Sequence, residues 1–419
     1  DGGFVRTAEH LIPVLEDDTH LVGEAATGSL RSTRRLGIRL EVSAPEPAGH
    51  YRVYAEVWGT DPVSHEVSKP VAWVGGMAGL GSGDLELGLD TRWITLSGAQ
   101  GPFELRNVRI EDRNYFITLT SAERIPLTLP ALPPTGVPAD RIVVDEEMLA
   151  GPRPAFLDLA EPGGGGVDCA KDHRLLLVHG YCSTNVWGPE IDDFDNAEVF
   201  LDLDQNRSHD QFAQLILGWA LDNGWRSYGI VAHSQGGMAA LHLYTYYWSG
   251  LDNAGDGRLI QSVGTPYQGT HLMDLWDVLI DLFTCGTNPD LSPAGAGQWL
   301  TGIPTLSRQE VSYYTTSANE SGLCWVTQFC CSLTAGILDG EDDGVVSYSK
   351  AQLPDGVNRG HKKGWCHSSA VTTWYCNPNV WCNDPQTTDG SRNDEMNANA
   401  AAASEEPPCR GLSGPPKTE

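Results

Sequence analysis

The chain has no long apolar run and few basic residues. None of its 419 residues lies in an apolar stretch that approaches the length of a membrane-spanning helix, so no transmembrane segment is expected. Lys and Arg number 27 against 55 Asp and Glu, and the formal net charge is -28. Nucleic acids and anionic membrane surfaces both favour clustered Lys and Arg. The composition argues against a nucleic-acid partner and fits a soluble protein exposed to the medium.

Cysteine is absent from the first 168 residues. All ten cysteines follow: Cys169, Cys182, Cys285, Cys324, Cys330, Cys331, Cys366, Cys376, Cys382 and Cys409. No CxxC pair occurs and only Cys366 has an adjacent histidine, which argues against zinc. An even count with irregular spacing favours disulfides of open connectivity in a secreted, extracellular protein, with free cytosolic thiols as the alternative. The polar first residues, DGGFVRTAEH, would suit a processed N-terminus.

The first 140 residues show the alternation that is typical of half-buried β-strands. Apolar side chains recur at every second position in LGIRLEV (36–42), HYRVYAEVW (50–58) and NYFITLT (114–120). Turns rich in Gly, Pro and Asp separate such runs. Several short strands in this length predict an all-β, sandwich-like accessory domain over residues 1–140.

The pattern changes after two segments of linker composition, PALPPTGVP (130–138) and EPGGGG (161–166). We expect a linker and bridging segment over 141–167. Beyond it, continuous apolar strands alternate with helices, as in HRLLLVHG (173–180), AEVFLDL (197–203), QFAQLILGWALDNG (211–224), SYGIVAHS (227–234) and LIQSVGTP (259–266). This alternation predicts an α/β catalytic domain over 168–384, with a mostly parallel sheet flanked by helices. Residues 385–419 are low in apolar side chains and are predicted to be a mobile, acidic, Ala/Pro-rich tail.

The stretch AHSQGG (232–237) places Ser234 between a predicted strand and a predicted helix. A serine nucleophile at such a corner needs small neighbours, which Ala232 and Gly236 supply. The N-terminus of the following helix favours developing negative charge. An ordinary tight turn is the alternative, so the prediction of a nucleophile depends on finding a base and an acid elsewhere.

Candidate partners lie downstream in the order Ser, acid, His. ILDGEDDGVVSYSK (337–350) offers Asp339, Asp342 and Asp343, and GHKKGWCHSSAV (360–371) offers His361 and His367. The flanking Gly and two Lys of the first histidine are typical of an exposed loop.

Five motifs in order resemble those of bacterial secreted lipases and esterases of the α/β-hydrolase superfamily. They are LLLVHGYCST (175–184), IVAHSQGG (230–237), SVGTPYQGT (262–270), DDGVVS (342–347) and CHSSAV (366–371). They cover about half the chain and leave the first 140 residues outside the match. Tyr267 stands where that family has His.

The resemblance implies the α/β-hydrolase fold and a set of site residues. Ser234 would be the nucleophile, Asp343 the acid and His367 the base, with the backbone N–H groups of Tyr181 and Gln235 forming the oxyanion hole. Asp343 is favoured over its neighbour because it directly precedes Gly-Val-Val, and Asp342 is expected to be solvated.

Two further histidines are expected to be structural. His179 would orient the oxyanion loop by hydrogen bonds. His233 would be a packed neighbour of Ser234, because adjacent residues at the corner point apart.

No cofactor is implied, and calcium has weak support. Many of these lipases have a calcium-binding Asp shortly after the catalytic His. In this sequence that Asp is either Ser369 or absent. Asp202, Asp204 and Asn206 alternate as at the start of a calcium loop, but the later Gly and Glu are missing, which favours a surface loop. THLMDLWDVLIDLFTC (270–285) has a wide apolar arc that suits either a core helix or a lid over an acyl pocket.

The sequence as a whole predicts a secreted serine hydrolase of carboxylic esters with an N-terminal β domain. Its partner would be an ester substrate, either dissolved or presented by a lipid or polymer surface. Two alternatives stay open: a depolymerase of polyhydroxyalkanoate or another polyester, and a non-catalytic binding protein on a hydrolase scaffold. The sequence does not fix the oligomeric state.

Overall fold

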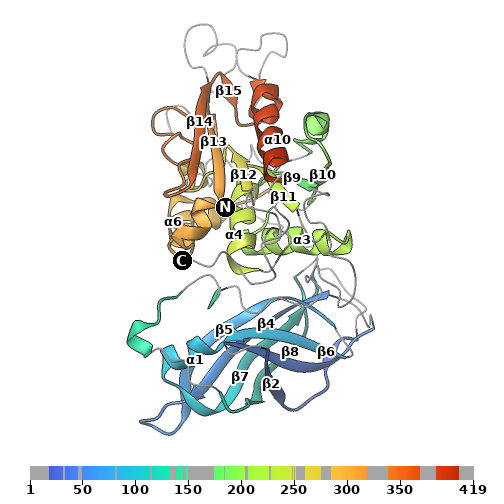
Figure 1. Ribbon diagram of the computed structural model, residues 1–419, viewed down its shortest axis with the longest axis vertical. Coiled ribbons are helices and arrows are strands. Elements are labelled where there is room, and N and C mark those ends of the chain that lie inside the picture. The colour runs from blue at the N-terminus through green and yellow to red at the C-terminus, as the bar shows by residue number, and fades with distance from the viewer. Residues whose placement is uncertain are drawn as a thin grey trace, which may run out of the picture. The chain divides into compact units, whose positions relative to one another are not determined.

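The computed structural model describes residues 18–31, 34–45, 50–80, 83–113, 116–132, 138–144, 148–149, 174–183, 185–202, 206–225, 228–247, 249, 251, 260–274, 285–318, 338–368 and 384–404. The chain divides into two compact units, Asp1–Ile142 and Val143–Glu419 (Figure 1). Among the described helices, none combines the length and the apolar character needed to cross a bilayer.

The described residues of the first unit form eight strands. They are β1 (His20–Leu21), β2 (Ala26–Leu30), β3 (Arg35–Ser43), β4 (His50–Thr60), β5 (Val67–Gly79), β6 (Asp84–Asp90), β7 (Gln100–Glu111) and β8 (Thr118–Thr128), with one helix, α1 (Thr91–Ser97). Hydrogen bonds join the strands in the order β1-β3-β2-β8-β7-β4-β5, and β6 pairs with β3.

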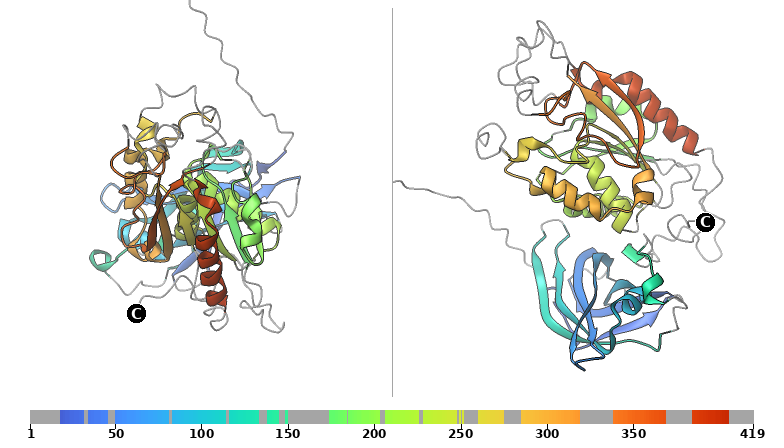
Figure 2. Two further views of the ribbon diagram at one scale, coloured as in Figure 1. Left: turned by 90° about the horizontal axis from the view of Figure 1, so that it is seen from above. Right: turned by 90° about the vertical axis from the view of Figure 1, so that its left-hand side faces the viewer.

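The alternation read from the sequence produces the core of this unit. In β3, the side chains of Ile38, Leu40 and Val42 are buried while Arg39 and Glu41 are exposed. Side chains from β3 to β8 meet in one apolar cluster, and the sheet folds over it (Figure 2). The predicted all-β, sandwich-like domain is therefore confirmed.

The second unit contains a six-stranded parallel sheet in the order β10-β9-β11-β12-β13-β14. Its strands are β9 (Arg174–Val178), β10 (Ala197–Phe200), β11 (Tyr228–His233), β12 (Ile260–Val263), β13 (Val311–Ser317) and β14 (Val357–Lys363). Among its described residues, the helices are α3 (His209–Asp222), α4 (Gln235–Tyr246), α6 (Pro293–Thr301), α7 (Thr305–Gln309) and α10 (Gly390–Ser404). A short pair, β15 (Trp365–Cys366) and β16 (Asp384–Pro385), lies outside this sheet.

Helices cover both faces of the parallel sheet (Figure 1). α10 packs on the face that carries Leu175, Leu177 and Val231, and α3 and α4 lie on the opposite face. The continuous apolar strands of the sequence are thus buried from both sides, as parallel sheets require. This is the predicted α/β-hydrolase architecture.

The structure differs from the predicted mobile tail over residues 384–404. That segment forms β16, a 3-10 turn at Gln386–Thr388 and the 15-residue helix α10. Met396 and Ala400, one helical turn apart, are buried in the core cluster against the sheet. The apolar stripe is narrow and made largely of alanine, so composition alone hid it. Residues 405–419 lie outside the described part of the chain.

Candidate active site

Ser234 lies at a strained corner between β11 and α4. Its backbone has φ 56° and ψ -133°, a conformation that costs of the order of 1–3 kcal/mol and persists only where the surroundings impose it. The Ser234 N–H donates to the carbonyl of Val263 at 3.0 Å, and Gly237 N–H donates to the Ser234 carbonyl at 3.1 Å. Ser234 as a whole residue is 7% exposed. The sharp strand-to-helix turn expected from AHSQGG is therefore present.

The loop after β9 packs directly against this corner. A Cβ on Gly180 would lie 2.4 Å from Ser234 Cβ, so only glycine allows the two backbones to approach this closely. Tyr181 follows in this loop, and Gln235 is the first residue of α4. Within the described residues, neither backbone N–H donates a hydrogen bond.

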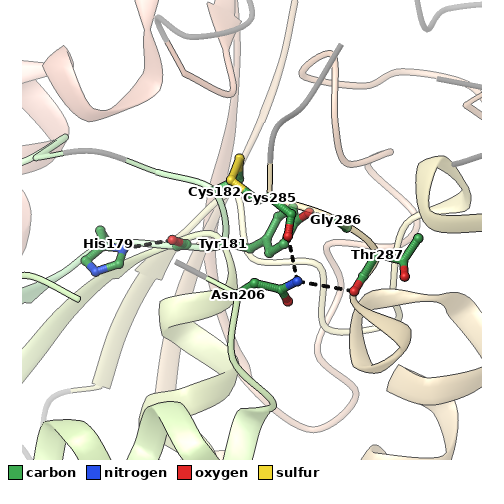
Figure 3. The surroundings of a disulfide bond; sticks show 8 residues. His179, Tyr181, Cys182, Asn206, Cys285, Gly286 and Thr287 are labelled. Atoms are coloured by element: carbon green, nitrogen blue, oxygen red, sulfur yellow. Dashed lines mark hydrogen bonds between the residues drawn. A yellow bond between two sulfur atoms is a disulfide. The ribbon is translucent and has the colours of Figure 1, made fainter. Parts of the chain in front are cut away.

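Several contacts fix this loop to the segment around residue 285 (Figure 3). Cys182 forms a disulfide with Cys285. The Tyr181 hydroxyl donates to the carbonyl of Gly286, and burial raises its pKa to about 12, which keeps it protonated as a donor. Asn206 Nδ2 donates to the Cys285 carbonyl at 2.7 Å. The proposed oxyanion donor Tyr181 therefore sits in a cross-linked loop.

His179 makes two hydrogen bonds that hold the same loop. Its Nδ1 donates to the Gly180 carbonyl at 2.7 Å, and its Nε2 accepts from the backbone N–H of Asp202 at 2.8 Å. Burial lowers the pKa of His179 and so favours the neutral ring that these two contacts need. The geometry matches the orienting role expected for this residue.

Asp343 lies in the turn that follows residue 338, where it is almost wholly buried. Its Oδ1 accepts from the backbone N–H groups of Val345 at 3.0 Å and Val346 at 2.7 Å. Its Oδ2 lies 2.7 Å from His367 Nδ1. One carboxylate oxygen is thus held by the turn itself, and the other faces the imidazole.

The structure also brings His367 beside the serine corner. The rings of His233 and His367 have centroids 4.6 Å apart, and His233 Nε2 donates to the His367 carbonyl at 2.8 Å. Since His233 directly precedes Ser234, the corner and the Asp343–His367 pair are neighbours. Within the described residues, no hydrogen bond joins Ser234 Oγ to His367. Such bonds are often long until substrate binds.

The other candidates for the base and the acid lie away from the Asp343–His367 pair or make different contacts. His361 was predicted in an exposed loop, which is wrong: it lies in β14, where its ring contacts Thr315 and Ser317 hydroxyls at 3.0 and 3.1 Å. Asp339 is exposed and lies 3.7 Å from His271.

Asp342 was expected to be solvated, and this too is wrong. It has no exposed surface, and its Oδ1 accepts from Gly344 N–H at 2.8 Å. The turn buries both acidic side chains because each caps backbone N–H groups that the turn would otherwise leave unsatisfied.

The remaining sequence candidates are placed only in part. Asp202 pairs with Arg207 at 2.8 Å, and Asn206 donates its amide N–H groups to carbonyls, while Asp204 lies outside the described residues. Tyr267 is buried, with its hydroxyl 2.8 Å from Ser262 Oγ. Of the segment proposed as core helix or lid, 275–284 lie outside the described residues, as does Ser369.

Sequence reasoning missed Gln386. This side chain is wholly buried, and its Nε2 lies 3.1 Å from the His367 carbonyl and 3.4 Å from Asp343 Oδ2. The surrounding sequence, DPQTTDG, matches no catalytic motif.

Comparison with known proteins identifies the family. Residues 170–400 match the C-terminal domain of conditioned medium factor, and residues 52–152 match its third Ig-like domain. The chain belongs to the conditioned medium factor family. Conditioned medium factor of Dictyostelium discoideum is 35% identical over 424 residues, which cover 95% of this chain. The chain spans only 56% of the length of that relative.

Solved structures show more distant similarity. A metagenomic carboxyl esterase is 17% identical, with 58% of this chain and 77% of that chain covered and a TM-score of 0.36. Phospholipase PlaB from Legionella pneumophila is 14% identical, with 43% and 46% covered and a TM-score of 0.33. Carboxylesterase CesB from Bacillus subtilis is 12% identical, with 48% and 80% covered and a TM-score of 0.28.

Proposed function

We propose that this member of the conditioned medium factor family is a serine hydrolase that cleaves carboxylic esters. Ser234 is the nucleophile, His367 the general base and Asp343 the residue that orients it. The backbone N–H groups of Tyr181 and Gln235 bind the oxyanion.

The reaction follows from these assignments. Ser234 Oγ attacks the ester carbonyl carbon while His367 Nε2 takes the hydroxyl proton, and the carbonyl oxygen becomes an oxyanion between the two N–H groups. The tetrahedral intermediate collapses, the alcohol leaves with the proton from His367, and an acyl-enzyme forms. Water, deprotonated by His367, then attacks the acyl carbon and releases the acid, which restores Ser234. Loss of one such oxyanion donor costs about 100- to 1,000-fold in rate.

The observation that carries this proposal is the hydrogen bond between Asp343 and His367 beside the strained corner at Ser234. A buried Asp–His pair alone is compatible with a purely structural role. Its combination with a serine at φ 56° and two free N–H groups at that corner is what acyl transfer requires.

We also propose an extracellular location and an ester that is dissolved or held at a lipid or polymer surface. The Cys182–Cys285 disulfide supports an oxidising compartment. The name of the Dictyostelium relative, which refers to conditioned medium, agrees with this.

Turnover of p-nitrophenyl esters of graded acyl length tests the proposal directly. The wild-type chain should hydrolyse at least part of the series and should react with a fluorophosphonate probe. Ser234→Ala should lose both reactions while it keeps its melting temperature. Ser349→Ala, which alters an exposed serine near the acid turn, is the matched control and should retain both. A folded wild-type chain without turnover or labelling would instead indicate a binding protein.

A further inference from the structure

Gln386 occupies the space behind the Asp343–His367 pair. It begins the 3-10 turn Gln386–Thr388, between β16 and α10. Four acceptor or ring atoms surround its Nε2: His233 Nε2 at 3.0 Å, the His367 carbonyl at 3.1 Å, His367 Nδ1 at 3.2 Å and Asp343 Oδ2 at 3.4 Å. A buried primary amide of this kind needs partners for both N–H groups and its oxygen.

The orientation of the amide follows from its neighbours. Its Oε1 accepts from the Thr316 hydroxyl. The reversed amide would place Oε1 against the Asp343 carboxylate and the His367 carbonyl, two acceptors that cannot donate. Gln386 therefore directs its N–H groups toward both residues of the pair.

The other N–H groups nearby do not use up the acceptor capacity of Asp343 Oδ2 and the His367 carbonyl. The proton on His367 Nδ1 points at Asp343 Oδ2, 2.7 Å away. His233 Nε2 donates to the His367 carbonyl. The two N–H groups of Gln386 are thus left with Asp343 Oδ2 and the second lone pair of the His367 carbonyl.

A glycine beside Gln386 leaves the space that its side chain fills. Gly264, at the end of β12, has φ 61°, and a Cβ there would lie 2.0 Å from Gln386 Nε2. The turn that carries Gln386 is tied down on its far side, where Asn393 Nδ2 donates to the Thr387 carbonyl at 2.8 Å and Lys362 Nζ pairs with Asp389 at 2.7 Å. These contacts hold the backbone of the turn, and so the Cα of Gln386, beside the pair.

We propose that Gln386 is a positioning residue that fixes the relative orientation of Asp343 and His367 through its amide N–H groups. This inference rests on the proposed hydrolase function. Gln386 touches neither the substrate nor the reacting atoms. Its effect is to keep Asp343 Oδ2 aligned with Nδ1, so that Nε2 of His367 stays the basic nitrogen.

The test replaces Gln386 by Met, which has a similar length and no polar hydrogen. We expect Gln386→Met to lower kcat by about 10- to 100-fold, the size expected when a hydrogen bond to a charged group is lost. KM should stay close to wild type, because the substrate contacts are unchanged. Gln386→Asn, which keeps the amide on a shorter side chain, should recover part of the lost kcat.

Gln261→Met is the matched control. Gln261 is equally buried and donates to the Met396 carbonyl at 2.8 Å, but it does not contact Asp343 or His367. It should lose stability as Gln386→Met does and keep the kcat of its folded fraction. Equal kcat losses in the two variants, or a wild-type kcat in folded Gln386→Met, would overturn the proposal.

A second readout separates this proposal from the hydrolase function. The Nδ1 proton of His367 should give a downfield proton NMR resonance in the wild-type chain. In Gln386→Met that resonance should move upfield and exchange faster with water, whereas Gln261→Met should leave it in place. This result would support the positioning role even if the wild-type chain cleaved no ester. An unchanged resonance in Gln386→Met would refute it.

Discussion

His367 is hydrogen-bonded to Asp343 twice. Its ring Nδ1 lies 2.7 Å from Asp343 Oδ2, and its backbone N–H donates to the Asp343 carbonyl at 2.7 Å. The turn containing the acid and the segment carrying the imidazole are therefore joined through their backbones as well as through their side chains. The backbone hydrogen bond therefore helps to fix where the His367 ring lies relative to Asp343. The residues around this pair can be tested one at a time.

Replacing Asp343 by Asn should remove the orienting carboxylate and leave the turn intact. The Asn Oδ1 can still accept from Val345 and Val346, but its NH₂ would face His367 Nδ1 and favour the wrong tautomer. We expect kcat to fall by about 10⁴-fold with little change in KM. Steady-state kinetics on one soluble ester would show this, and a kcat near wild type would exclude Asp343 as the orienting acid.

Asp342→Ala should affect stability rather than catalysis. Asp342 is buried and accepts from Gly344 N–H, so its loss leaves an unsatisfied group in the turn. We expect the free energy of unfolding to fall by about 1–3 kcal/mol, with the kcat of the folded fraction largely retained. Urea unfolding and kinetics on the same preparation distinguish the two effects. If Asp342→Ala were stable and inactive, the acid would have been assigned to the wrong residue of the pair.

The sequence was most informative where one residue pattern determines one local structure. The short apolar runs of β9 and β11 lie between turn residues and helical segments, which favours buried strands, and the sharp corner at Ser234 is typical of small residues between a strand and a helix. Asp343 was favoured as the acid because it directly precedes Gly344, as the acid does in the lipases that the sequence resembles, and this assignment stays a prediction. These inferences depend on neighbours in the chain.

The errors have two different causes. Asp342 looked solvated because acidic turns usually are, but its side chain is buried and accepts from the N–H of Gly344 within the same turn. The other errors concern residues whose environment comes from distant parts of the chain. α10 looked mobile because its buried stripe is mostly alanine. Gln386 lies 43 residues from Asp343 and 19 from His367, with no motif connecting them. The contacts on which its proposed role rests form only when β12, β13 and the segment before α10 are assembled.

Removing the Cys182–Cys285 disulfide should destabilise the second unit and slow catalysis. The bond closes a loop with a sequence separation of 103, and the loss of such a cross-link costs roughly 2–5 kcal/mol. We expect Cys182→Ser/Cys285→Ser to show a lower urea midpoint and a lower kcat, because Tyr181 directly precedes the bridge. Asn206→Ala, which loses only hydrogen bonds to the same segment, is the milder control. An unchanged midpoint in the double variant would show that the loop is held without the bridge.

Buried neutral histidines should make stability fall in mild acid. His209 packs against Trp299, donates from Nε2 to the Asp290 carbonyl at 3.2 Å and faces Gln235 through Nδ1. Burial lowers its pKa to about 4; nearby Asp290 opposes this shift and His242 adds to it.

The sign of the pH effect follows from proton binding. Between pH 6.5, the ordinary pKa, and about 4, the unfolded chain binds a proton at His209 that the folded chain does not. The free energy of unfolding should therefore decrease as the pH falls through this window. Burial also lowers the pKa of His179 and His233, which adds to the same slope.

His209→Gln tests the share of this one residue. Gln can keep the donor to Asp290 but does not titrate, so the free energy of unfolding should fall less steeply between pH 6.5 and about 4 than in the wild-type chain. Part of the slope should persist because His179 and His233 are unchanged. Urea unfolding at a series of pH values measures both chains, and equal slopes for His209→Gln and wild type would mean that His209 accepts a proton in the folded chain as readily as in the unfolded one.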